Sequence, residues 1–179
     1  AFMEKVASRI IRPTVEGLQQ EGIPYTGFIF IGLIKVGEDP FVIEYNVRMG
    51  DPETEAVIPR IQTDLADLLS ATAAGRLGEI ELEVSDEAAA TVVMVSGGYP
   101  EAYEKGYPIT GLDSVKGATV FHAGTGRNAG GRVVTNGGRV LAVTALGADF
   151  RDALDKAYQG VSGLQFTDAY YRTDIGFDL

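Results

Sequence analysis

Apolar side chains recur at helical spacing near the start of the chain. Val6, Ile10 and Leu18 fall on one stripe, so residues 2–21 are predicted to form a helix with one buried face. Pro13 lies inside this stretch and lacks the N–H group that a helix interior uses. The helix is therefore expected either to kink there or to divide into two short helices.

The next apolar stretches have the composition of strands. Residues 25–36 are dominated by Phe, Ile, Gly and Leu, which is typical of a buried strand. Residues 37–40 form a turn signal, and residues 41–48 are predicted as a second strand. The region thus predicts a β-hairpin with a four-residue connection. A second helix is expected to follow, with Pro59 interrupting its start and an apolar stripe of Ile61, Leu65, Leu68 and Leu69.

The second half of the chain has a different sequence pattern, with short apolar segments separated by glycine-rich turns. Residues 136–138, Asn-Gly-Gly, are predicted as a hairpin turn because these residues tolerate positive φ angles. Asp149 is expected to cap a helix that runs to about Gln159. Strands are predicted at residues 88–95, 119–123, 132–135 and 139–146. These patterns predict an α+β chain in two parts: residues 1–76 with helix, antiparallel hairpin and helix, and residues 77–179 as a small β-rich barrel- or sandwich-like domain with one main helix.

Composition narrows the function classes. The chain of 179 residues is 45% hydrophobic, enough for a real core, and its formal charge of −10 argues against nucleic-acid binding. It has no Cys and only one His, which excludes thiolate and multi-histidine metal sites, so any metal is expected among oxygen ligands. No apolar run is long enough to span a bilayer, and the first residues do not have the pattern of a secretory signal. A cytoplasmic protein without a membrane partner is therefore expected.

The most informative segment lies on the second predicted strand. Alternate residues of a strand share a face, so Glu44, Asn46 and Arg48 are expected to point one way. Burying these groups without partners would cost about 1–3 kcal/mol for each neutral group and more for each charge. The face is therefore wet, internally paired (for example by a Glu44–Arg48 ion pair) or bound to a ligand. A carboxylate and an amide oxygen two residues apart suit a hard cation such as Mg²⁺, and Arg48 could hold a phosphoryl or carboxylate oxygen.

Residues 44–55, Glu-Tyr-Asn-Val-Arg-Met-Gly-Asp-Pro-Glu-Thr-Glu, resemble the signature of the glycinamide ribonucleotide synthetases, which are ATP-grasp ligases. The resemblance continues in order over essentially the whole chain, through residues 25–28, 32–33, 96–100, 121–125, 135–140 and 171–176. It implies that residues 1–76 are the C-terminal part of an ATP-grasp domain and that residues 77–179 are the family's C-terminal domain.

The resemblance also implies a reaction. The family joins 5-phosphoribosylamine and glycine in de novo purine biosynthesis, with ATP hydrolysed to ADP and phosphate through a glycyl phosphate. ATP is then a co-substrate, and the ATP-borne Mg²⁺ or Mn²⁺ is implied to bind Glu44 and Asn46. Arg48, Asp51 and Glu53 are implied to lie beside the transferring phosphate and the glycine.

Two departures from the pattern accompany this resemblance. Many ATP-grasp enzymes carry another acidic metal ligand on the preceding strand, at a position that is Gly32 here. The family's N-terminal domains, with the adenine-binding lysines and the glycine-rich phosphate loop, are absent from residues 1–179. This fragment is therefore expected to be inactive by itself and to need those missing domains as its partner.

Two other interpretations stay open, namely another ATP-grasp ligase and a non-catalytic binding or assembly module. The remaining candidate motifs have structural interpretations. Residues 124–130 are expected to form a hairpin loop rather than a dinucleotide fingerprint, because no helix follows them. Ser96 is expected in a turn, and His122 is more simply a hydrogen-bonded structural histidine than a catalytic one.

Overall fold

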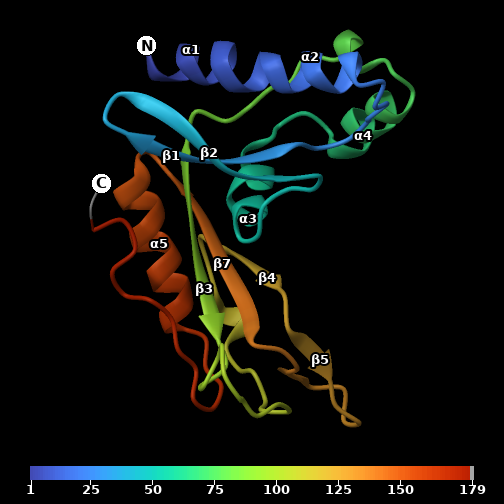
Figure 1. The fold of residues 1–179 in the computed structure, drawn as a ribbon. Coiled ribbons are helices and arrows are strands. Elements are labelled where there is room, and N and C mark those ends of the chain that lie inside the picture. Colours follow the sequence, from blue (N-terminus) through green and yellow to red (C-terminus); the bar gives the residue numbers. More distant parts are fainter. Residues whose placement is uncertain (178–179) are drawn as a thin grey trace. The chain divides into compact units, whose positions relative to one another are not determined.

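The computed structural model describes residues 1–177, which divide into two compact units. Unit 1 comprises residues 1–50 and 64–81, and unit 2 comprises residues 51–63 together with the chain from residue 82 onward. The mixture of helices and sheets confirms the predicted α+β class (Figure 1). The chain therefore passes from unit 1 to unit 2 directly after the segment that carries Glu44 and Asn46.

Unit 1 begins with the predicted helix, which is continuous but not uniform. It runs as α1 (Phe2–Val6), a π-helical segment η1 (Ala7–Ile11) and α2 (Arg12–Gln20). The wider π turn comes immediately before Pro13, so the helix continues past the proline instead of breaking. The predicted stripe faces inward, with Val6 and Ile10 buried.

The predicted β-hairpin is confirmed, with a shorter connection. Strands β1 (Phe30–Val36) and β2 (Asp39–Asn46) pair antiparallel, and the turn consists of Gly37 and Glu38 alone, with Gly37 at a φ of 61°. The interpretation of the first strand as buried is wrong. Side chains on the face turned away from the helix are half exposed, at 50% for Ile34 and 54% for Phe41, because α1–α2 covers only the other face.

Charged side chains fasten the helix to the hairpin turn. Lys5 Nζ lies 2.8 Å from Asp39 Oδ1 and donates to the carbonyl of Glu38, and Arg9 also donates to Asp39 at 2.8 Å. The Lys5 hydrogen bond and charge, with a smaller contribution from Arg9, hold the pKa of Asp39 below its ordinary value of 3.8.

Asp39→Asn is expected to lower the melting temperature of unit 1 by a few degrees at most near neutral pH. A depressed folded-state pKa stabilises the fold above the unfolded value and loses that effect as the pH falls through the folded pKa. The difference between the two proteins is therefore expected to shrink as the pH is lowered below 3.8. Thermal unfolding followed by circular dichroism, near neutral pH and again below pH 3.8, measures the difference in melting temperature. Glu16→Gln, at an exposed site on α2, is the control; a deficit of Asp39→Asn that persists unchanged in acid would contradict the assignment.

The helix expected after the hairpin is divided in the structure. It forms α3 (Glu53–Val57), the 3₁₀ segment η2 (Ile58–Arg60) and α4 (Leu65–Ala73), with a short 3₁₀ segment η3 (Leu77–Glu79) after it. Ile61 does not join the apolar stripe but pairs with Val84 in an isolated antiparallel bridge. Asp64 caps α4 by accepting from the backbone N–H groups of residues 66 and 67. A cap inside the predicted helix explains why one helix became two.

Unit 2 is built on an open three-stranded antiparallel sheet with the order β3 (Ala88–Val95), β7 (Arg139–Gly147), β4 (Thr119–His122). Helix α5 (Phe150–Ser162) runs along this sheet and is capped by Asp149, as predicted (Figure 1). A short 3₁₀ segment η4 (Leu112–Ser114) and a two-stranded sheet of β5 (Thr125–Arg127) and β6 (Val133–Thr135) complete the unit. Its core is apolar, with side chains of Val92, Met94, Val140, Leu141, Val143, Ala157 and Val161 almost fully buried.

Two expectations for unit 2 are corrected. The sheets of the described residues are open, and no barrel closes: β7 pairs with β3 and β4, while β5 and β6 form a separate two-stranded sheet. Residues 136–138 do not connect a hairpin, since β6 and β7 belong to different sheets. The hairpin loop predicted in residues 124–130 is confirmed. Asn128 Oδ1 accepts from the backbone N–H groups of residues 130 and 132 in the turn between β5 and β6.

None of the helices between residues 1 and 177 combines the length and the apolarity required to cross a membrane.

Candidate functional site

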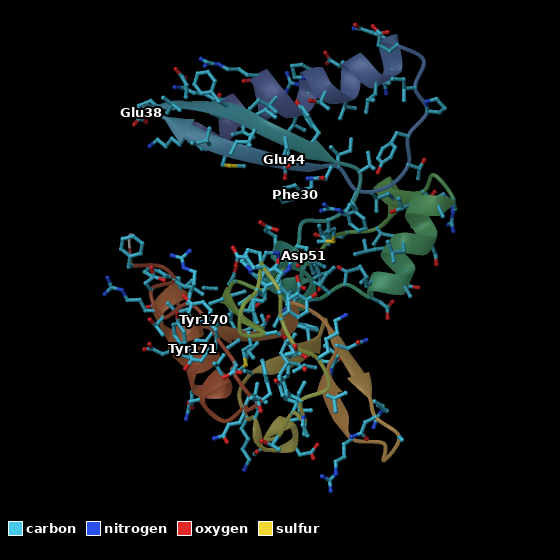
Figure 2. The ribbon with its side chains drawn as sticks, turned by 60° about the horizontal axis from the view of Figure 1, so that its bottom comes forward. Phe30, Glu38, Glu44, Asp51, Tyr170 and Tyr171 are labelled. Carbon is cyan, nitrogen blue, oxygen red and sulfur yellow. The ribbon has the colours of Figure 1, made fainter. Side chains whose placement is uncertain are left out.

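Glu44 and Asn46 lie side by side on β2, as the strand period predicted. Asn46 Nδ2 donates to Glu44 Oε1 at 3.0 Å. Tyr45, between them, points to the opposite face, where its hydroxyl lies 3.0 Å from the hydroxyl of Thr14 on α2. The Glu44 side chain therefore stands on the solvent-exposed face of the hairpin, away from α1–α2 (Figure 2).

Gly32 occupies the position directly across from Glu44 in the β1–β2 ladder. A Cβ atom at position 32 would lie 3.1 Å from Glu44 Cγ, closer than side chains normally approach. The glycine thus leaves space for the Glu44 side chain, at the position where many ATP-grasp enzymes are expected to carry an acidic residue. The protein presents one carboxylate and one amide at this point, with no second carboxylate across the ladder.

Arg48 does not complete a row with Glu44 and Asn46. Strand β2 ends at Asn46, and the guanidinium of Arg48 donates to the adjacent carbonyl of Met49 at 3.0 Å. In the described part of the chain no ion pair joins Arg48 to Glu44, so the expected alternating face is correct for two of its three members. The exposed Arg48 side chain retains donors for another partner.

Asp51 and Glu53 belong to unit 2, and they differ in their surroundings. The Asp51 carboxylate is held by Arg139, at 2.9 Å from Nη2 to Oδ2 and 3.2 Å from Nη1 to Oδ1. The exposed Glu53 begins α3 directly after Pro52. The two carboxylates of this turn are therefore not equivalent, since one already has a cationic partner.

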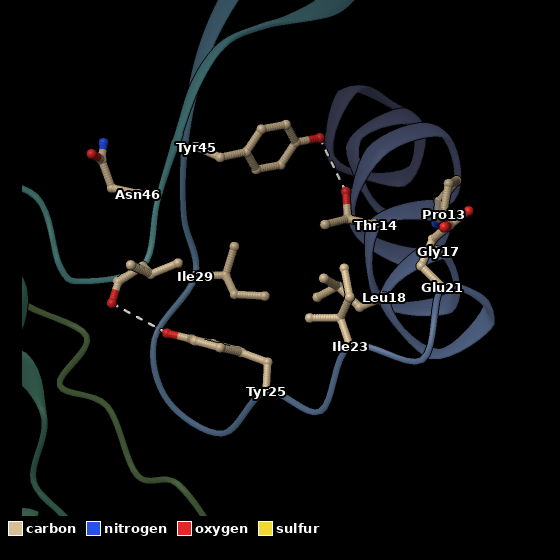
Figure 3. Close-up of a pocket in the computed structure, with 11 residues that line it drawn as sticks. Pro13, Thr14, Gly17, Leu18, Glu21, Ile23, Tyr25, Ile29, Tyr45 and Asn46 are labelled. Atoms are coloured by element: carbon tan, nitrogen blue, oxygen red, sulfur yellow. Dashed lines mark hydrogen bonds between the residues drawn. The ribbon is translucent and has the colours of Figure 1, made fainter.

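Tyr25 joins the two segments that enter and leave the hairpin. Tyr25 Oη lies within hydrogen-bond distance of the carbonyls of Phe28 (2.6 Å) and Val47 (3.2 Å), which joins the segment before β1 to the residue after β2. Tyr25 also borders a mostly apolar cavity of about 480 Å³ between α2 and the hairpin (Figure 3). The Asn46 side chain stands at the edge of this cavity and points away from it.

A second cavity, of about 410 Å³, lies within unit 2 beside the Asp51–Arg139 pair. Its wall combines Pro52, Arg139, the outer side chains of β3 and the segment around Tyr170 and Arg172. The sequence alone gave no reason to associate Arg139 with residue 51, because 88 positions separate the two. The one feature of the sequence that pointed to Arg139 was its place in residues 135–140, a segment that carried the family resemblance.

Glu44 and Asn46 suit a metal ion whose other ligands are waters and substrate phosphates. Within residues 1–177, no group of three or more His, Cys, Asp or Glu side chains is arranged to hold a metal ion. Glu44, which is exposed, and Asn46, which is half-buried, offer two adjacent oxygen-bearing side chains. Mg²⁺ is commonly held by one or two carboxylates, with waters and substrate phosphates completing its shell, and the pair fits that requirement.

The remaining candidates have structural roles. Ser96 is buried and donates to the carbonyl of Gly137 at 2.8 Å, so its interpretation as a turn serine is confirmed. The exposed His122 lies 3.1 Å from the Thr125 hydroxyl through Nδ1, which agrees with a hydrogen-bonded structural histidine.

Family models match both parts of the chain. The model for the phosphoribosylglycinamide synthetase C domain matches residues 89–178, and that for the ATP-grasp (A) domain of the same synthetase matches residues 1–54. The two matches account for most of the chain, in the order that the sequence predicted.

Similar proteins along the same stretch are named phosphoribosylamine–glycine ligases. The chain is 47% identical over 177 residues to a phosphoribosylamine–glycine ligase of Chlorobaculum tepidum and 48% identical to one of Rhizobium meliloti. It spans 41% and 42% of the lengths of these two relatives. The crystal structure of phosphoribosylamine–glycine ligase from Thermotoga maritima superimposes with a TM-score of 0.84 at 35% identity, covering 96% of this chain and 42% of that chain. The matches over both halves show that the chain belongs to the phosphoribosylglycinamide synthetase family.

Proposed function

We propose that this chain is the C-terminal part of an ATP-dependent ligase that joins 5-phosphoribosylamine and glycine in purine biosynthesis. Residues 1–76 would contribute to its ATP-grasp domain, and residues 77–179 would form its C-terminal domain. The observation that carries the proposal is that the exposed Glu44 and the half-buried Asn46 share one face of β2, with Asn46 Nδ2 3.0 Å from Glu44 Oε1. The identity of the substrates is inferred from the family to which the chain belongs.

In this proposal, Glu44 and Asn46 hold the Mg²⁺ or Mn²⁺ that accompanies ATP. A bound divalent ion neutralises crowded phosphate oxygens and so favours phosphoryl transfer. To bind it, Asn46 must present its carbonyl oxygen, which means releasing the hydrogen bond that its amide now donates to Glu44. This exchange costs little free energy because Glu44 is exposed and Asn46 only half-buried, so water can replace the lost hydrogen bond.

Arg48 and the turn at residues 50–53 have the chemistry to bind the reacting groups. Arg48 is exposed and makes its contact to a neighbouring carbonyl, so it can turn to hold a phosphoryl or carboxylate oxygen. Glu53 offers a carboxylate for the glycine ammonium group, and Asp51 fixes the turn that presents it. We therefore assign Arg48, Asp51 and Glu53 to the substrate-facing part of the site.

The reaction would proceed in two transfers. A carboxylate oxygen of glycine attacks the γ-phosphorus of ATP, the bond to the bridging oxygen breaks, and glycyl phosphate and ADP form. The amine nitrogen of phosphoribosylamine then attacks the acyl carbon, and phosphate leaves as the nitrogen loses a proton. Because an acyl phosphate hydrolyses in water, the site must exclude solvent and hold both substrates in one geometry.

Phosphate release by the full-length enzyme tests the proposal. We expect release only when ATP, glycine, phosphoribosylamine and Mg²⁺ or Mn²⁺ are all present, and we expect EDTA to abolish it because the transfer depends on the metal. The chain of residues 1–179 alone is expected to release no more phosphate than its Glu44→Ala variant. Equal turnover with bicarbonate in place of glycine would instead assign the chain to another ATP-grasp ligase, and a full-length protein without turnover would favour a binding module.

A further inference from the structure

Arg139 makes a contact that no chemistry discussed so far requires. It is the first residue of β7, and its guanidinium reaches the turn at residues 50–53, which lies 88 positions earlier in the chain. Nη2 lies 2.9 Å from Asp51 Oδ2, Nη1 lies 3.2 Å from Oδ1, and Nη1 also approaches the Asp51 carbonyl at 3.4 Å. One side chain thus contacts both the carboxylate and the backbone of residue 51.

The backbone of Arg139 is held firmly from the sheet side. Its carbonyl accepts from the N–H of Gly124 at 2.8 Å, and it pairs with Val95 in the β3–β7 ladder. The carbonyl of the preceding residue, Gly138, accepts from the N–H of Ser96 at 2.8 Å. The guanidinium therefore extends from a rigid point of the C-terminal domain, which is what a residue needs in order to orient a loop.

The contact is poorly suited to a role in stability. The side chains of Arg139 and Asp51 are 40% and 56% exposed, and ion pairs at such exposure contribute little to folding. A planar guanidinium that binds both carboxylate oxygens nevertheless fixes direction well. Arg139 also lines the 410 Å³ cavity, together with Pro52.

We infer that Arg139 is a positioning residue for the ligase reaction: it holds Asp51 so that the turn at residues 50–53 presents Glu53 to the substrates. This inference rests on the proposed function. It assigns to Arg139 a direct part in fixing the turn that carries Asp51 and Glu53, within the same unit, without needing to touch a substrate itself. Asp51 then acts chiefly as the anchor of the turn.

The test uses the full-length enzyme with Arg139→Gln, Arg139→Lys, Asp51→Ala and the Arg139→Gln/Asp51→Ala pair. Arg139→Gln is expected to lower kcat about tenfold or more, because a misplaced loop costs turnover. Its melting temperature and its KM for ATP are expected to stay near those of the unsubstituted enzyme. Arg139→Lys keeps the charge but not the two-pronged contact, so it is expected to recover part of the loss.

The double variant decides whether Arg139 acts through Asp51. If it does, Arg139→Gln has no further effect in the Asp51→Ala background; if the two losses multiply, the inference is overturned. Arg132→Gln, on the exposed β5–β6 turn, is the matched control. The inference is also overturned if Arg139→Gln performs like this control, or if its melting temperature falls in step with its activity. An unsubstituted enzyme without ligase activity would overturn the proposed function itself, which separates the two failures.

Discussion

Replacing Glu44 by Ala in the full-length enzyme is expected to lower kcat at ordinary Mg²⁺ concentration by at least about a hundredfold. Glu44 is the single carboxylate on the open face of β2, and its cross-strand neighbour Gly32 has no side chain to replace it. Removing partners that merely support metal ligands already costs about 10–100-fold, so loss of a direct ligand is expected to cost more. A hundredfold loss corresponds to about 2.7 kcal/mol of transition-state stabilisation. Steady-state phosphate release, measured as Mg²⁺ or Mn²⁺ is varied, checks this.

Glu38→Gln is the matched control for Glu44. Glu38 lies in the turn of the same hairpin, and its side chain makes only a surface ion pair with Lys35. Its replacement is expected to leave kcat unchanged. Glu44→Gln is expected to need more metal for half-maximal activity, since an amide binds Mg²⁺ more weakly than a carboxylate. If Glu44→Ala keeps normal turnover and an unchanged metal requirement, the metal assignment is wrong.

Gly111→Ala is expected to destabilise unit 2 by about 3 kcal/mol or more. Gly111 precedes η4 with a φ of 87°, a conformation that costs an L-residue about 1–2 kcal/mol. An added methyl group would also overlap the backbone carbonyl oxygen of Gly163, directly after α5. Both atoms belong to backbone segments, which cannot turn aside as a flexible side chain can. The neighbouring Thr110 and Gln165 exchange backbone hydrogen bonds at 2.9 and 3.1 Å, which holds the two segments at this distance. Urea unfolding monitored by circular dichroism measures the loss.

Gly117→Ala separates backbone strain from overlap. Gly117 has a similar φ of 73°, but no atom outside its immediate neighbours lies within 4 Å of the position of an added Cβ. Its substitution is expected to cost only the strain, about 1–2 kcal/mol. Equal losses for the two variants would show that the close approach of Gly111 to α5 is relaxed at little cost.

The period of the apolar residues determined most of the local structure of this chain. Strand β3 was predicted with its observed bounds, the Asp149 cap of α5 was identified, and the stripe through Val6 and Ile10 is buried. Glu44 and Asn46 were placed on one face because alternation along a strand is a local rule. The family signature in residues 44–55 located the candidate site without any knowledge of the fold.

Errors arose where distant segments decided the outcome. Ile61 left the predicted helix because residues 82–85 pair with its segment, and residues 136–138 failed as a hairpin because β6 and β7 have different partners. Apolar composition alone made residues 25–36 appear buried, although burial depends on what covers each face.

The sequence by itself thus determined most of the helices and strands, the class of fold, the family and the pair Glu44 and Asn46, because these follow from residue type and short-range spacing. Only the tertiary structure decided that Arg48 lies beyond the strand and that Arg139 holds Asp51 across 88 positions of the chain. Contacts of that range depend on how strands pair and where a ladder ends, and no pattern within a single segment encodes either.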